Sequence, residues 1–128
     1  MQPDSPRTTL AGVRLQVSLD DFFRVMARWR LTQDQQRELL GGMSSDAYAR
    51  LAAGTAPDIQ ASVSARITTI AAIDRAVVRK LGNPEAVPQW FWMANSERPF
   101  LGAPPLALML RDRAGLSIVA NYLKCEAR

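Results

Sequence analysis

The chain has no histidine and only one cysteine, Cys125. These absences exclude Ser–His–Asp and Cys–His nucleophiles, and zinc sites built on histidine or on several cysteines. The twelve acidic residues are scattered, without an apolar context that would shift a pKa, and no glycine-rich phosphate loop occurs. We therefore expect a protein that is not an enzyme, with no catalytic residue, bound metal or cofactor.

Long apolar runs are also missing. No run approaches the roughly 20 residues that span a bilayer, and no basic segment followed by an apolar core opens the sequence. A lone cysteine forms no internal disulfide, which fits a reducing compartment. With 128 residues, 48% hydrophobic and 22% charged, the chain fits one domain or two small helical lobes that share a core. We expect a cytoplasmic protein without membrane contact.

The net charge of +4 invites a nucleic-acid partner, because a basic surface releases counterions from phosphates. Its distribution weakens that interpretation. Residues 1–60 carry seven arginines against seven acidic residues, whereas residues 61–128 carry nine basic residues against five acidic ones. The surplus therefore lies in the second half of the chain.

The periodicity of apolar residues predicts an all-α fold. Residues 1–17 show no sustained period and are interpreted as a flexible arm, either unstructured or pairing with a partner. Ser18 is a good N-cap for a first helix. One apolar stripe then follows at helical spacing, and its default role is in the core: Leu19, Phe22, Phe23, Met26 and Trp29.

A helix-turn-helix outline follows. Thr32 caps a second helix that ends at Gly41-Gly42, and residues 44–46 cap a third helix expected over Ala47 to Ala53. The stretch LTQDQQRELLGGMSSDAYARLAAG resembles the helix-turn-helix of Xre-type regulators. The third helix is then either a DNA-reading element or a scaffold and dimer surface. As DNA contacts it offers only Ser45, Tyr48 and Arg50, with Asp46 opposing them.

A long helix is predicted from about Ala61 to Leu81, ended by Gly82-Asn83-Pro84. Its apolar stripe contains Asp74, which we expect to pair with an arginine or to face the rim of an interface. After it we expect three short helices. The first runs from Pro84 or Glu85 to Trp92 or Met93, a loop covers residues 94–103, Pro104 and Pro105 open the second helix, and Gly115 breaks it from the last.

This C-terminal segment resembles the toxin-binding domain of the Xre/MbcA/ParS antitoxin family. The resemblance covers roughly residues 62–128 and depends on the order and spacing of a short set of residues: Trp90, Asn95, Leu101-Gly102, Pro105-Leu106, Gly115, Val119 and Leu123. It implies an antitoxin of a type II toxin–antitoxin system that neutralises a RES-domain, NAD-consuming toxin by occluding its active site. It also implies that the antitoxin itself needs no catalytic group.

The predicted layout is a flexible arm (1–17), an Xre-like helix-turn-helix (18–61) and a toxin-binding domain (62–128), with the long helix joining the two helical lobes. We interpret the Trp, Pro and Gly residues of the pattern as fold-defining. The candidate toxin contacts are polar or close to the C-terminus: Asn95, Arg98, Arg111, Arg113, Tyr122, Lys124, Glu126 and Arg128. The alternative for each charged residue is a solvated surface charge. Cations near the C-terminus could enter a pocket shaped for NAD phosphates.

Two other functional hypotheses stay open. The first is a DNA-binding transcriptional regulator without a toxin partner, a role compatible with an antitoxin that represses its own operon. The second is a structural or dimerisation module. Paired helix-turn-helix units match two-fold DNA sites, so a homodimer or a larger toxin–antitoxin assembly on operator DNA is expected.

Overall fold

The computed structural model describes residues 19–56 and 59–126. Within these ranges it contains helices and turns and no strand, which confirms the all-α prediction. The predicted arm 1–17, its neighbour Ser18 and the candidate contact Arg128 lie outside the described residues. In the described part no helix is long and apolar enough to cross a membrane.

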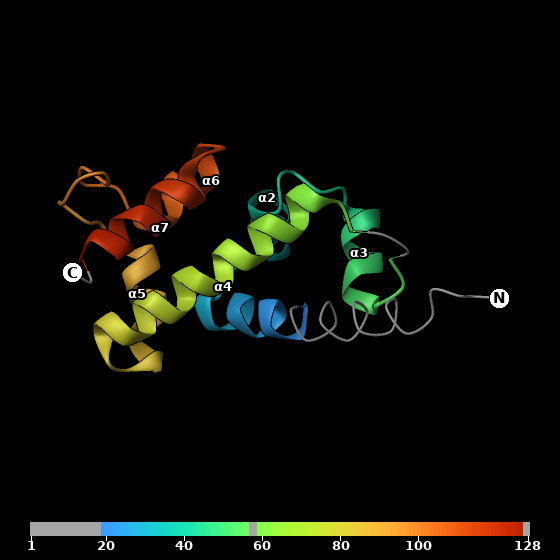
Figure 1. The fold of residues 1–128 in the computed structure, drawn as a ribbon, viewed down its shortest axis with the longest axis horizontal. Coiled ribbons are helices and arrows are strands. Elements are labelled where there is room, and N and C mark those ends of the chain that lie inside the picture. The colour runs from blue at the N-terminus through green and yellow to red at the C-terminus, as the bar shows by residue number, and fades with distance from the viewer. Residues whose placement is uncertain (1–18, 57–58, 127–128) are drawn as a thin grey trace.

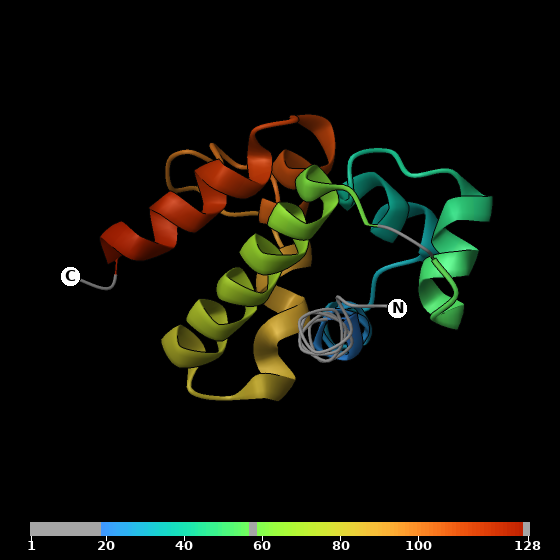
Figure 2. The same ribbon diagram turned by 45° about the vertical axis from the view of Figure 1, so that its right-hand side comes forward.

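The helices follow the order expected from the sequence (Figure 1). The first covers residues 19–29, and the others are α2 (Gln33–Leu39), α3 (Ser45–Ala53), α4 (Ala61–Leu81), the 3-10 helix η1 (Pro84–Ala86), α5 (Val87–Trp92), α6 (Pro105–Arg111) and α7 (Gly115–Glu126). The predicted long helix matches α4 at both ends. It runs through the middle of the molecule, between the first helix and α7 (Figures 1 and 2).

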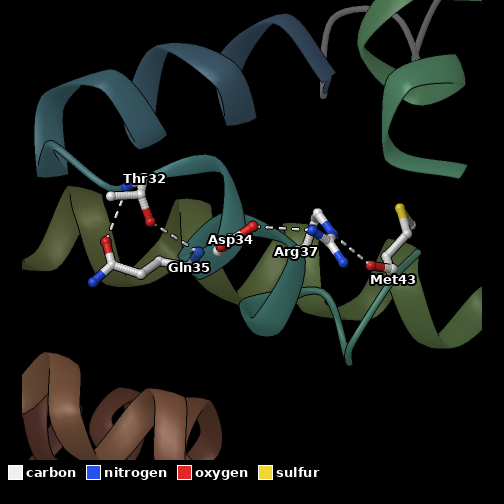
Figure 3. A network of polar contacts seen from close by, with 5 residues as sticks. All are labelled: Thr32, Asp34, Gln35, Arg37 and Met43. Carbon is white, nitrogen blue, oxygen red and sulfur yellow. Dashed lines mark hydrogen bonds and ion pairs between the residues drawn. The ribbon is translucent and has the colours of Figure 1, made fainter. Parts of the chain in front are cut away.

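Side-chain caps determine where α2 and α3 begin. The backbone N–H of Gln35 donates to Thr32 Oγ1 at 3.2 Å, while the N–H of Thr32 donates to Gln35 Oε1 at 2.9 Å, which completes a capping box (Figure 3). The N–H of Ala47 donates to Ser44 Oγ at 3.1 Å, so α3 begins at Ser45, two residues before the predicted start. Capping by Ser44 alone explains the difference.

The turn between α2 and α3 is held by Arg37. Its Nε donates to the carbonyl of Met43 at 2.9 Å and its Nη1 to Asp34 Oδ1 at 3.0 Å (Figure 3). Gly41 and Gly42 have φ values of 94° and 84°, a region that disfavours side chains bearing a Cβ. The sequence Gly-Gly is therefore what allows α3 to turn away from α2.

The first helix is joined to the rest of the core through Trp29, which is completely buried. Its ring stacks on Phe91 of α5, with centroids 3.9 Å apart, and its Nε1 donates to Asp74 Oδ1 at 2.9 Å. The other carboxylate oxygen of Asp74 lies 3.4 Å from Arg28 Nη1. The predicted pairing of Asp74 with an arginine is confirmed, and Asp74 lies in the core at 5% exposure.

One buried apolar cluster extends from Leu19 to Leu123 and includes residues on both sides of position 61. The helix α4, which begins at Ala61, contributes Val63, Ile67 and Ile70 to this cluster, so the apolar core continues across position 61. The helix-turn-helix region and the C-terminal region therefore share a core.

Gly115 was expected to break the chain between two helices, but it is the first residue of α7. The break itself lies at residues 112–114, where α6 ends. A Cβ on Gly115 would lie 2.7 Å from the Cα of Met109 and against the carbonyl oxygen of Leu108. Glycine is required there because the backbones of α6 and α7 meet without room for a side chain.

Candidate interaction surfaces

The connection between α5 and α6 is an ordered loop over residues 93–104. The N–H of Gly102 donates to the carbonyl of Asn95 at 2.7 Å, and the N–H of Asn95 donates to the carbonyl of Ala103 at 3.2 Å. The side-chain oxygen of Asn95 accepts the N–H of Glu97 at 2.9 Å. Asn95, a candidate toxin contact, is half-buried and closes the loop on itself.

Aromatic contacts attach this loop to α5 and α7. Phe100 is 4% exposed and makes edge-to-face contacts with Trp90 and Tyr122, at centroid distances of 5.9 and 5.0 Å. The hydroxyl of Tyr122 donates to Glu97 Oε1 at 2.6 Å. Burial first, and then this hydrogen bond, raise the pKa of Tyr122, so the phenol stays protonated and remains a donor.

Glu126 is also used within the fold. Its carboxylate pairs with Lys80 of α4, and this hydrogen bond lowers the pKa of Glu126. Both side chains stay about one-third exposed, so the pair contributes little to stability. Through Tyr122 and Glu126, the C-terminal half of α7 therefore contacts the loop and α4, respectively.

The other candidate toxin contacts lie at two ends of one helix. Arg111 and Arg113 flank the N-terminal end of α7, whereas Tyr122, Lys124 and Glu126 lie toward its C-terminal end, the end that contacts the loop carrying Arg98. Twelve helical residues span about 18 Å. The structure therefore places Tyr122 against Glu97, the neighbour of Arg98, and places Arg111 and Arg113 at the other end of α7. Arg98, Arg111, Arg113 and Lys124 are exposed, and none forms an ion pair with another described residue.

Three exposed apolar side chains on or beside this loop were not among the candidate contacts predicted from the sequence. Trp92 is 44% exposed, Met93 61% and Leu101 72%, and they are the large apolar side chains that the described part of the chain exposes. A signal was present: four consecutive large apolar residues, Trp90 to Met93, cannot all face one side of a helix. Phe91 takes the buried side, and Trp92 and Met93 are left outside.

Leu101 also has an uncommon backbone conformation, with φ at 53°. A residue with a Cβ in this left-handed region carries strain of the order of 1 kcal/mol. The neighbouring Gly102, at φ 96°, adopts its conformation without that cost. The loop therefore presents an exposed leucine at a position where asparagine or glycine would be easier to accommodate.

The candidate DNA contacts on α3 divide into exposed and buried residues. Ser45 and Arg50 are exposed, as expected for DNA contacts. Tyr48 is only 2% exposed, packs edge-to-face on Phe23 and donates its hydroxyl to Gln36 Oε1. Burial raises its pKa to about 12. The prediction that Tyr48 contacts DNA is wrong. Position 48 lies on the buried face of α3, which packs on the first helix and α2.

Comparisons of the chain with protein-family models, with curated proteins and with solved structures found no match.

Proposed function

We propose that the chain is the antitoxin of a type II toxin–antitoxin pair and neutralises a RES-domain, NAD-consuming toxin by covering its active site. The observation that carries this proposal is the loop 93–104. It is braced by hydrogen bonds and aromatic contacts, yet it exposes Met93 and Leu101, and Trp92, the residue before it, is partly exposed as well. Aromatic residues and methionine are enriched at protein–protein interfaces relative to the rest of a protein surface.

The resemblance to the Xre/MbcA/ParS family supports the same surface. Asn95 closes the loop, Leu101-Gly102 supplies its two positive φ values, and Gly115 lets α7 cross α6. The pattern that carries the resemblance is thus the pattern that builds the loop. The proposed contact surface consists of Trp92, Met93 and Leu101, with Arg98 as an exposed cation of the same loop.

Co-expression with a RES toxin encoded beside this gene tests the proposal. We expect the wild-type chain to co-purify with the toxin and to restore growth. Met93→Asp should weaken binding at least about tenfold, since it places a charge in an apolar contact. Ser117→Asp adds the same charge at an exposed position on α7 and should change binding less than about twofold.

A toxin that stays lethal beside the wild-type chain and does not co-purify with it would refute the proposal. Equal binding by Met93→Asp and Ser117→Asp would leave the antitoxin role standing and reject the loop as its contact surface. Point substitutions are needed because deletion of residues 122–128 would remove Leu123, which is buried at 4% exposure, together with the Tyr122–Glu97 hydrogen bond.

DNA binding is the second candidate function, alone or together with toxin binding, as repression of the chain's own operon. The observation that favours it is α3, capped by Ser44 and following a braced turn, with Ser45 and Arg50 exposed. A mobility shift with the upstream DNA at several salt concentrations tests it, and Arg50→Ala should weaken the shift. A chain that bound neither toxin nor DNA but formed a concentration-dependent oligomer would instead be a dimerisation module.

A further inference from the structure

A groove of about 1000 Å³ lies on a different part of the molecule from the loop 93–104. Its walls come from the α2–α3 turn, α3, the N-terminal part of α4 and the connection between α6 and α7. Figure 2 shows α3 facing the N-terminal end of α4 across this region. Apolar side chains line part of it, among them Met43, Leu51, Ile59 and Val63.

The charged side chains that line the groove are all arginines. They are Arg50 from α3, Arg66 from α4 and Arg113 from the α6–α7 connection, and none of the described lining residues is Asp or Glu. Arg50 and Arg113 are exposed and make no ion pair with a described residue. Three cations from three separate segments therefore meet at one concave surface without a counter-charge among those residues.

Arg66 is fixed in place at this surface. Its Nε donates to the carbonyl of Leu39, and its Nη1 donates to the carbonyl of Arg113 at 3.3 Å. Partial burial, and then repulsion from the charge of Arg113, lower the pKa of Arg66. An anion bound between the two guanidinium groups would offset both effects. The first turn of α4 also lies here, with no acidic residue and no side-chain cap from Gln60, so its N–H groups favour the same charge.

We propose that this groove binds a small organic phosphate of mononucleotide size. The phosphate would contact Arg50, Arg66 and Arg113, and the organic part would pack on the apolar lining. Guanidinium groups bind phosphate oxygens in pairs of parallel hydrogen bonds, and small-ligand pockets are about 300–1000 Å³ in volume. A DNA duplex is too wide to enter a groove of about 1000 Å³, and its phosphate backbone would not cover the apolar lining.

The ligand would link the two regions of the chain. Arg50 belongs to the helix-turn-helix and Arg113 to the C-terminal region, whose packing presents the loop 93–104. A ligand held by both would stabilise their relative position and raise the melting temperature as its concentration rises above the dissociation constant. This inference does not depend on whether the chain is an antitoxin.

Isothermal titration calorimetry on the full chain tests the inference with adenosine monophosphate, adenosine and inorganic phosphate as probes. We expect adenosine monophosphate to bind at least about tenfold more tightly than adenosine, because the arginines recognise the phosphate. Inorganic phosphate should bind more weakly and compete for the same site. Arg50→Ser and Arg113→Ser should each weaken the binding of adenosine monophosphate about tenfold.

Arg111→Ser is the matched control, because Arg111 is exposed, lies two residues from Arg113 and does not line the groove. It should change the affinity less than about twofold. Arg66 is left unchanged, since its hydrogen bonds support the turn after α2. Far-ultraviolet circular dichroism confirms that each variant is folded.

Any of four results would overturn the inference. The first is no saturable binding of either phosphate probe at millimolar concentration. The second is equal affinity for adenosine monophosphate and adenosine. The third is an affinity for adenosine monophosphate that is the same in Arg113→Ser and wild type. The fourth is binding of a DNA duplex that requires Arg113 while adenosine monophosphate does not bind, which would assign these arginines to nucleic acid.

Discussion

The helix α3 and the loop 93–104 differ in whether they expose large apolar side chains. The exposed positions of α3 carry small or polar side chains such as Ser45, Ala49 and Arg50, and its large apolar side chains, Tyr48 and Leu51, are buried. In the loop, the side chain of Asn95 is used in internal hydrogen bonding, whereas Leu101 is exposed. Polarity alone is therefore a poor guide to which residues face a partner.

The difference separates the two candidate partners. A DNA-reading helix needs donors and acceptors for base edges, with cations beside them for phosphates, and α3 offers one exposed arginine together with the opposing Asp46. A protein interface gains from desolvated apolar anchors, and the loop exposes Met93 and Leu101, next to the partly exposed Trp92 at the end of α5. The loop is the better supported interaction surface.

Gly115→Ala should have the largest effect on stability. It should disturb the packing of α6 and α7, the helices next to the loop 93–104. The new methyl group would meet the backbone of Leu108 and Met109, which cannot move without displacing α6. We expect a loss of about 3 kcal/mol in the free energy of unfolding, measured by urea denaturation. Gly42→Ala is the comparison: a Cβ there meets no atom within 4 Å, so its cost is the strain of a positive φ alone, roughly 1 kcal/mol. A smaller loss for Gly115→Ala than for Gly42→Ala would contradict the close crossing of α6 and α7.

Asp74→Ala tests the connection between the first helix and the rest of the core. It removes the acceptor of the Trp29 indole N–H and the partner of Arg28 in a buried setting, so we expect a loss of about 2–3 kcal/mol. Asp74→Asn retains an oxygen for Trp29 and should lose roughly 1 kcal/mol less. Tryptophan fluorescence and circular dichroism should report one shared transition. Two separate transitions in the wild-type chain would show that the two regions unfold independently.

Tyr48→Phe tests the burial of position 48 through the dependence of stability on pH. The pKa of Tyr48 is about 12 in the folded chain and about 10 when unfolded, so its hydroxyl stabilises the fold below pH 10 and that contribution falls as the pH rises from 10 to 12. The wild type should lose about 1 kcal/mol more than Tyr48→Phe between pH 9 and pH 11, measured by urea denaturation at each pH. Parallel losses in the two proteins would mean that the phenol is accessible to solvent.

Much of this fold could be predicted from the sequence. Caps and glycines act locally, so Thr32 predicts the start of α2, the serines at 44 and 45 predict the start of α3 to within two residues, and Gly54 and Gly82 predict where α3 and α4 end. The apolar stripe from Val63 to Leu81 predicts α4 in the same way. These signals depend on neighbours within one or two helical turns.

The surfaces were harder to predict, because they depend on contacts between distant segments. The exposure of Met93 follows from the loop that joins Asn95 to Ala103, and the role of Gly115 follows from the backbone of α6. The groove combines Arg50, Arg66 and Arg113, which are separated by 16 and 47 residue positions in the sequence. Only their arrangement in space reveals them.

Leu101→Asn should have the smallest effect on stability, and it separates stability from binding at the loop. Asparagine tolerates a positive φ better than leucine does, and the side chain is 72% exposed, so little packing is lost. We expect a gain of a few tenths of a kcal/mol, measured by urea denaturation, together with at least about tenfold weaker binding to the proposed toxin. Leucine at this position would then be explained by partner binding, at a small cost to the fold. Unchanged toxin binding by a stabilised variant would exclude Leu101 from the interface and leave its strained conformation without a functional explanation.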